Sequence, residues 1–164
     1  KTPRAKEAVP NEHTGVNAEL YAELLAGIFV ETRRTLRTQG IVVVTFHNTK
    51  LEAWAALAKA LSRAQLKVVA IATVHAENEA DHAKRHKMSF SKDLVLECRP
   101  GSGPSSPWVT TDDDSLEAAE LVAIGRALAA HPDGDLGLME NDFHRFLMPG
   151  YDSRIGRHFS TSQP

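Results

Sequence analysis

The run Ile41–His47 constrains the fold of this chain more than any other stretch. It reads Ile-Val-Val-Val-Thr-Phe-His, and five of its seven residues are β-branched, which favours a strand. An uninterrupted apolar run of this kind is typical of a strand buried on both faces. The polar residues Asn48, Thr49 and Lys50 follow, and an apolar stripe at helical spacing starts at Leu51. We therefore expect a strand-to-helix junction, which is where open α/β sheets bind ligands.

A helix and a second strand follow this junction. The helix is predicted to end near Gln65, with Thr49 as its N-cap and Glu52 as the partner in a capping box. A β-rich run then covers Lys67–Val74. Residues 41–74 thus predict two parallel strands joined by a right-handed helical crossover. The apolar face of the helix would consist of Leu51, Trp54, Leu57, Ala58 and Leu61.

A long helix is predicted before the first strand. Apolar residues recur every three or four positions from Ala18, and the pattern ends at the cations Arg33, Arg34 and Arg37. Gly40 is predicted as a left-handed cap behind this helix. The cations suit the negative end of the helix dipole, and two interpretations stay open: a solvated last turn or a phosphate-binding cluster.

A third strand is predicted over Asp93–Arg99. Cys98 within it is expected to be a buried core thiol, since no neighbouring residue would lower its pKa. The following Gly101-Ser-Gly103 has two glycines of a dinucleotide loop, but Pro104 and Pro107 would block the helix that must hold the pyrophosphate. The sequence also contains no Walker loop, nucleophile elbow or paired-carboxylate motif.

The predicted fold class is α/β, with a partial sheet of about three strands, flanking helices and a C-terminal helical pair. Asp112, Asp113 and Asp114 are expected at the start of the first helix of this pair, and Asp135 at the start of the second. Whether the pair packs on the sheet stays open. The predicted divisions are an extended arm at 1–15, the α/β part at 16–100, a flexible linker at 101–111, the helical pair at 112–150 and a loose tail at 151–164.

Composition limits the classes of function. A net charge of -2 and a pI near 6.5 argue against capture of nucleic acid by the whole surface, so a DNA role would need a local basic patch. A single cysteine excludes an internal disulfide and fits a reducing compartment. The sequence shows no signal peptide and no apolar span of membrane length, so we expect a cytoplasmic protein without a membrane partner.

The candidate binding residues are His47 and Asn48, with Thr49 and Lys50 beside them. A side chain at the end of a buried strand can point into a crevice while the sheet fixes its backbone. An imidazole and a carboxamide there could hydrogen-bond the planar edge of a nucleobase. The alternative is that both residues only cap the following turn and helix.

Residues 75–90 form a predicted loop with two possible roles. His82 and His86 are four residues apart, with His75 upstream, and could bind zinc. The surrounding cations oppose a dication, so no metal site is expected and a solvated loop is favoured. As a strand-end loop the same cluster could instead contact DNA phosphates through Lys84, Arg85 and Lys87.

The stretch Phe29–Trp54 resembles the C-terminal half of the catalytic domain of adenine-specific DNA methylases. In that group a helix leads to an Arg-x-Leu-x-x-x-Gly turn, here Arg34–Gly40, before a strand that ends in Thr-Phe-His, here Thr45–His47, and a helix carrying a tryptophan. The second strand with Glu77 and the run Leu94–Pro100 look like the final two strands of the group. The resemblance covers about residues 16–100.

This resemblance implies the C-terminal part of a Rossmann-like, S-adenosylmethionine-dependent methyltransferase sheet, with its third strand antiparallel to its neighbours. His47 and Asn48, with Thr49 and Lys50, would then face the pocket that receives the flipped target base. The loop 75–90 would lie on the same edge. The partners implied are DNA and the N-terminal half of the methylase.

The departures from the family pattern limit the expected activity. In the family a glycine-rich cofactor loop and an Asp-Pro-Pro-Tyr catalytic motif precede the matched region, and this sequence contains neither. Ala64-Gln65-Leu66 stands where Ala-Gly-Phe is usual, and Thr73-Val74 where Trp-Pro is usual. We therefore expect a fragment or truncated relative that has no catalytic residue and binds no S-adenosylmethionine alone, although the full-length enzyme would.

An alternative from another class is a non-catalytic α/β module. An incomplete sheet leaves strand edges and faces that can pair with a second copy or with a partner protein. This alternative needs no cofactor, metal or DNA.

Overall fold

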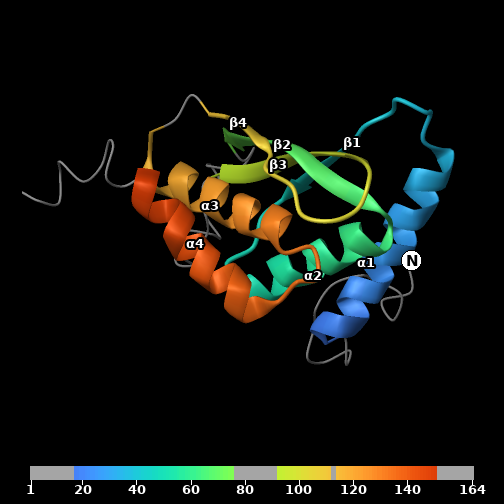
Figure 1. Cartoon of the computed structure of the whole chain (residues 1–164), viewed down its shortest axis with the longest axis horizontal. Coiled ribbons are helices and arrows are strands. Elements are labelled where there is room, and N and C mark those ends of the chain that lie inside the picture. Colours follow the sequence, from blue (N-terminus) through green and yellow to red (C-terminus); the bar gives the residue numbers. More distant parts are fainter. Residues whose placement is uncertain (1–16, 76–91, 112–113, 151–164) are drawn as a thin grey trace, which may run out of the picture.

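The computed structural model describes residues 17–75, 92–111 and 114–150, which form an α/β fold with four helices and a four-stranded mixed open sheet (Figure 1). The extended arm predicted at 1–15 and the tail predicted at 151–164 lie outside these residues. None of the described helices combines the length and apolar character needed to span a bilayer. In chain order the elements are α1 (Ala18–Thr35), β1 (Val42–Phe46), α2 (Leu51–Arg63), β2 (Leu66–His75), β3 (Lys92–Pro100), β4 (Trp108–Thr110), α3 (Leu116–Ala130) and α4 (Leu136–Gly150).

The strand order in the sheet is β1-β3-β2-β4. β3 pairs antiparallel with both β1 and β2, as expected for the third strand. Since both strands oppose β3, β1 and β2 run in the same direction, which confirms the parallel relation predicted for residues 41–74. They are not adjacent, however, because β3 is inserted between them. β1 is therefore an edge strand within the described sheet.

The segment predicted as a flexible linker, 101–111, contains the fourth strand. β4 pairs in parallel with β2, with Ile71 opposite Val109. The Ser105 hydroxyl also donates a hydrogen bond of 2.7 Å to the carbonyl oxygen of Val68. Residues 101–107 have no regular secondary structure, but residues 108–110 extend the sheet beside β2, which the glycine, serine and proline content of the segment did not indicate.

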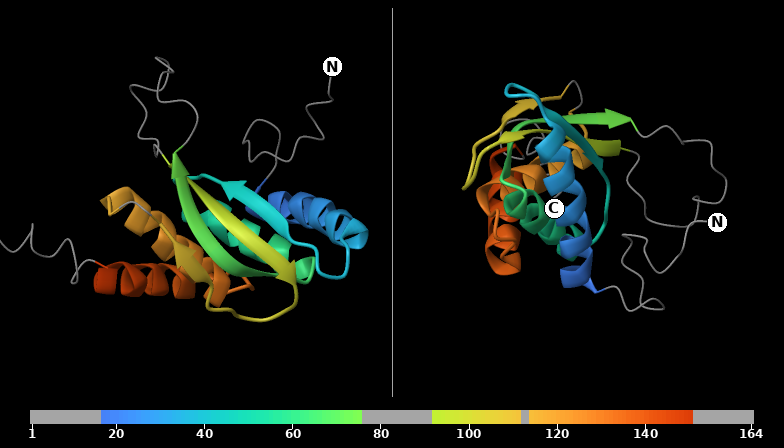
Figure 2. Two further views of the ribbon diagram at one scale, coloured as in Figure 1. Left: turned by 90° about the horizontal axis from the view of Figure 1, so that it is seen from above. Right: turned by 90° about the vertical axis from the view of Figure 1, so that its right-hand side faces the viewer.

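The sheet has one face covered by helices. α2 and α3 pack against it, α1 packs on α2, and α4 packs on α3 (Figure 2). The strand residues that face these helices are almost fully buried and form one core with them. The most deeply buried of them on the strands are Ile71, Leu94, Leu96 and Cys98.

The other face of the sheet is open, which corrects the prediction that the first strand is buried on both sides. Val43 is 58% exposed, and Thr45 beside it on the same face is also exposed. Val42, whose side chain points to the helices, is buried. β-branched residues satisfy the backbone preference of a strand on either face, so the composition of the run did not reveal which face was covered.

Two predicted caps were wrong. α2 begins after Lys50, not Thr49, and the N-cap side chain makes no capping hydrogen bond. α1 ends at Leu36, which is extended, and Gly40 is not in the left-handed region. Instead Gly40 makes room for a neighbour, because a Cβ there would lie 2.6 Å from Leu36 Cγ.

The C-terminal helices belong to the same core as the sheet, which answers the question left open by the sequence. Gly125 lets α3 approach the strands closely, since a Cβ there would lie 2.8 Å from Leu94 Cδ2. α4 returns along α3, and His131 Nε2 lies 2.9 Å from Asp142 Oδ2 between the two helices. The side chain of Asp135 caps α4 as predicted, accepting a hydrogen bond of 3.0 Å from the backbone N–H of Leu138.

Candidate ligand cavity at the end of β1

The junction between β1 and α2 is held by a short hydrogen-bonded turn. The Asn48 side-chain oxygen accepts a hydrogen bond of 2.9 Å from the backbone N–H of Lys50. Asn48 also accepts one of 2.9 Å, through its carbonyl oxygen, from the indole N–H of Trp54. Because the amide oxygen is used within the turn, the amide nitrogen is the group that Asn48 can offer to a ligand.

Trp54 is fixed at this junction from two sides. Besides its hydrogen bond to Asn48, its ring meets Phe46 edge to face, with the ring centroids 4.8 Å apart and the planes at 78°. The residue is only 3% exposed. A buried indole with its N–H satisfied is a rigid wall, so the space beside it keeps its shape.

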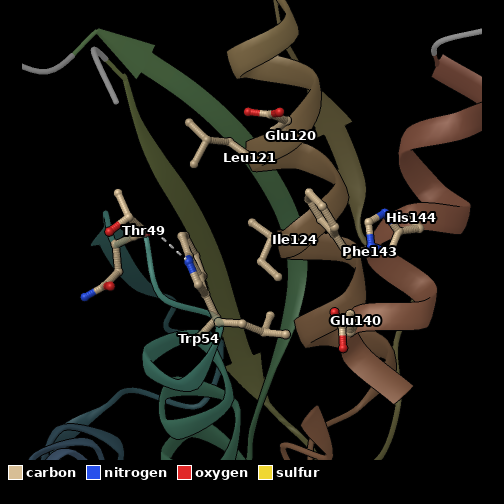
Figure 3. Close-up of a pocket in the computed structure, with 10 residues that line it drawn as sticks. Thr49, Trp54, Glu120, Leu121, Ile124, Glu140, Phe143 and His144 are labelled. Carbon is tan, nitrogen blue, oxygen red and sulfur yellow. Dashed lines mark hydrogen bonds between the residues drawn. The ribbon is translucent and has the colours of Figure 1, made fainter. Parts of the chain in front are cut away.

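A half-open cavity of about 360 Å³ lies beside Trp54, between the start of α2 and the α3–α4 pair (Figure 3). Small-molecule sites in proteins begin at about this volume. Figure 3 shows Trp54 on one side, Phe143 and His144 of α4 on the other, and Leu121 and Ile124 of α3 between them. The residues that line it are Asn48, Thr49, Leu51, Trp54, Glu120, Leu121, Ile124, Glu140, Phe143 and His144.

The polar side chains of the cavity include two carboxylates. α3 contributes the Glu120 carboxylate and α4 contributes the Glu140 carboxylate. Burial raises the pKa of Glu120 above its usual value, and the neighbouring charge of Glu117 raises it further. Within the described part of the chain, no lysine or arginine lines the cavity. The site is therefore an apolar and aromatic pocket with a negative rim.

The structure brings together part of the predicted site. Asn48 and Thr49 line the cavity, whereas His47 and Lys50 are not among its lining residues. Lys50 is exposed at the start of α2. Half of the set predicted from the junction thus faces the pocket, while His47 contacts β3 and Lys50 faces solvent.

His47 is turned toward β3. Its Nδ1 lies 3.1 Å from the carbonyl oxygen of Lys92 and 3.0 Å from Asp93 Oδ1. Both partners are acceptors, so Nδ1 carries the proton and donates to them. The imidazole is 27% exposed, so it is not embedded in the hydrocarbon core. The role of His47 visible here is to tie the end of β1 to the start of β3.

The predicted phosphate contacts Lys84, Arg85 and Lys87 lie outside the described residues, as do His82 and His86 of the alternative zinc site. The third histidine of that site, His75, has its Nε2 3.4 Å from Lys92 Nζ. Residues 17–75, 92–111 and 114–150 contain no group of three potential metal ligands.

The α3 and α4 side of the cavity was missed by the sequence analysis. Glu140, Phe143 and His144 are spaced by three and four residues, which places them on one face of α4. On α3, Ile124 follows Leu121 by three residues and Glu120 by four. The sequence shows a stripe of aromatic and acidic residues on one face of a predicted helix. This pattern does not indicate that the stripe lies opposite Trp54.

The turn after β1 does not fit an S-adenosylmethionine site. Such a site needs glycines where backbone N–H groups approach the cofactor, and the turn after β1, residues 47–50, contains none. The aromatic cavity is lined by side chains of α2, α3 and α4 and by the turn residues Asn48 and Thr49. Comparison of the chain with protein families, curated proteins and solved structures found no match.

Proposed function

We propose that this chain forms the target-base side of the pocket in an S-adenosylmethionine-dependent DNA adenine-amino methyltransferase, within a Rossmann-like sheet. The cofactor site and the catalytic motif would come from residues outside this sequence, and we assign no methyl-transfer step to the chain itself. The observation that carries the proposal is the cavity at the end of β1, where Asn48 and Thr49 meet the rigid ring of Trp54.

The strand arrangement supports the same proposal. The resemblance implied a third strand antiparallel to its neighbours, and β3 has this orientation between β1 and β2. A four-stranded sheet with this one reversed strand is compatible with the C-terminal part of a methyltransferase sheet.

The cavity chemistry suits an unstacked base. Stacking of a base on an aromatic ring contributes about 1–3 kcal/mol. Trp54 and Phe143 offer two such rings, while the Asn48 amide nitrogen can donate to a ring nitrogen or carbonyl of the base. A base within a duplex could not reach these groups, so a flipped or unpaired one is required.

Binding of an unpaired adenine tests this proposal. Trp108 is 84% exposed and lies outside the cavity, so the Trp108→Phe variant leaves Trp54 as the single fluorescent tryptophan. A duplex with one unpaired adenine should quench Trp54 and bind more tightly than the fully paired duplex. In this background Asn48→Ala should weaken binding by about threefold to tenfold, since one hydrogen bond is lost.

The matched control is Thr45→Ala, because Thr45 is exposed on the open face of the sheet, away from the cavity. Its affinity should equal that of the parent. Equal affinity for paired and unpaired duplexes, or an unchanged affinity of Asn48→Ala, would contradict the proposed function. Micromolar binding of S-adenosylmethionine in titration calorimetry would contradict the assignment of the cofactor site to other residues.

A second candidate function, self-association through β1, is favoured by the edge position of this strand. β1 contains no charged residue and no proline, which are the usual protections of an edge strand. Ile41 and Val43 next to this edge are 43% and 58% exposed. Two copies could therefore pair along β1 without burying a charge.

Light scattering with two matched variants distinguishes this candidate. Val43→Lys places a charge on the edge strand, whereas Val74→Lys places it on β2, which is inside the sheet. Edge pairing predicts a dimer that only Val43→Lys dissociates. A wild-type monomer at high concentration would rule out this function.

A further inference from the structure

The cavity combines two aromatic walls with two carboxylates supplied by different helices. Trp54 and Phe143 lie on opposite sides of the space, and Glu120 and Glu140 lie toward its opposite ends (Figure 3). α3 and α4 lie outside the part of the chain that resembles the methylases. The resemblance therefore implies nothing about the acidic side of the pocket. Its chemistry indicates which edge of a ligand the pocket prefers.

Carboxylates recognise N–H groups in a planar pair most strongly when these groups belong to an amidine or a guanidine. Among the described residues the lining contains no lysine or arginine that could bind a phosphate or a carboxylate of a ligand, and His144 is its one basic side chain. Burial and the charge of Glu117 both oppose the ionisation of Glu120. An N–H donor or a positive charge on a ligand would stabilise the ionised carboxylate, so binding such a ligand would be favoured.

We propose that the cavity binds a flat aromatic ring with an amidine-type edge, packed against its aromatic walls and hydrogen-bonded to Glu120, Glu140 or both, and that it excludes the ligand's phosphate. The inference rests on the proposed function because it concerns the same cavity. It adds which hydrogen-bonding edge of a ligand the cavity recognises. Two such N–H donors occur in cationic aryl amidines, whereas adenine offers one, from its amino group, beside a ring nitrogen that accepts a hydrogen bond.

Benzamidine and benzamide test this inference directly, because they share shape and differ in charge and donor number. In the Trp108→Phe protein, benzamidine should quench Trp54 with at least about tenfold higher affinity than benzamide. Glu120→Gln should reduce this preference to about threefold or less, since a neutral amide replaces a charged acceptor. Glu140→Gln, on the more exposed helix α4, is the second variant if Glu120→Gln does not fold.

The matched control is Glu97→Gln, which removes the same charge from the open face of the sheet, where Glu97 pairs with Arg99. It should keep the full preference for benzamidine. Adenosine and inosine form a second pair that differs by an amino and a keto group, and adenosine should bind more tightly if a nucleobase is the source of the edge. Stronger binding of adenosine 5′-monophosphate than of adenosine would overturn the exclusion of phosphate.

The outcomes separate this inference from the proposed function. Equal or absent binding of benzamidine and benzamide, or full preference retained in both glutamine variants, would overturn the inference even if the unpaired adenine binds. A preference for benzamidine that depends on Glu120 or Glu140 supports the inference. If the unpaired adenine then fails to bind, the proposed function fails while the amidine site stands as one for a free small molecule.

Discussion

The two faces of the sheet have similar sequences and opposite surroundings. On β3, Leu94 faces the helices and is fully buried, whereas the adjacent Val95 points to the open face and is only partly buried. On β1, Val42 is buried and Val43 is 58% exposed. β-branched and other aliphatic residues therefore predict that a strand forms. Whether such a residue contributes to the core depends on whether α2 and α3 cover its face of the sheet.

The same contrast applies to function. The covered side carries the cavity, because α2, α3 and α4 meet there around Trp54. The open side carries exposed apolar residues, including Trp108, and an unpaired edge at β1 within the described sheet. The proposed base-binding role lies on the first side and the alternative role in association on the second.

Truncation of a covered residue should have the largest effect on stability. Leu94→Ala should lower the free energy of unfolding by roughly 2–5 kcal/mol, because it leaves a cavity beneath α3. Val95→Ala, one residue along and on the open face, should cost less than about 1 kcal/mol. Urea unfolding followed by circular dichroism measures both. Similar losses would mean that the open face is covered in solution.

The turn between α3 and α4 gives the second prediction. Gly134 has φ of 67° and a Cβ there would lie 2.5 Å from the carbonyl oxygen of Ala55, so Gly134→Ala should cost roughly 3 kcal/mol. Gly103 has φ of 80° but open space around it, so Gly103→Ala should cost only about 1–2 kcal/mol. Thermal unfolding compares the two variants. Equal costs would show that the turn between α3 and α4 is not in close contact with α2 at Ala55.

The buried thiol of Cys98 predicts a pH dependence on the covered side. Burial, with a smaller contribution from the charge of Glu97, raises the pKa of Cys98 from 9.0 to about 12. The folded protein thus keeps the Cys98 thiol neutral, while in the unfolded chain the thiol ionises above its ordinary pKa of 9.0. The resulting stability is fully present below pH 9 and declines between about pH 9 and pH 12, by up to about 1.4 kcal/mol per pH unit.

Urea unfolding between pH 8 and pH 10 tests this effect against the Cys98→Val variant, which keeps the volume and cannot ionise. Tyr21 also has a raised pKa, so the difference between the two proteins is the quantity to follow. The wild-type protein should lose stability faster than the variant. Identical slopes would show that the thiol is accessible to water.

The smallest expected effect concerns the cavity carboxylate. The pKa of Glu120 is raised, so its ionisation opposes folding, and this penalty is absent below the ordinary pKa of 4.5 and develops as the pH rises above it. Glu120→Gln should therefore increase stability slightly at pH 7 and leave it unchanged near pH 4. Glu97→Gln on the open face should show no such gain. A loss of stability of Glu120→Gln at pH 7 would mean that the Glu120 carboxylate stabilises the fold and is not kept for binding a ligand.

Much of the fold followed from local patterns. The apolar spacing from Ala18 and from Leu51 placed α1 and α2 within a few residues, and the β-branched runs placed β1, β2 and β3. Cys98 was expected in the core and is fully buried. These predictions were confirmed because periodicity and β-branching act over a few residues, without reference to the rest of the chain.

The candidate site was only half visible. Asn48 and Thr49 were predicted from their place after a buried strand, but His47 was assigned to the pocket and instead donates to Asp93. That contact joins residues 46 positions apart, and no local pattern encodes it. The carboxylates of Glu120 and Glu140 were missed for the same reason.

The sequence by itself determined which segments become helices and strands, because side-chain shape and spacing set the local backbone preference. Only the tertiary structure decided that β3 enters between β1 and β2, that one face of the sheet stays open, and that α3 and α4 close a cavity over Trp54. The physical reason is that burial depends on contacts between distant segments, and several arrangements of the same elements satisfy the local preferences equally well.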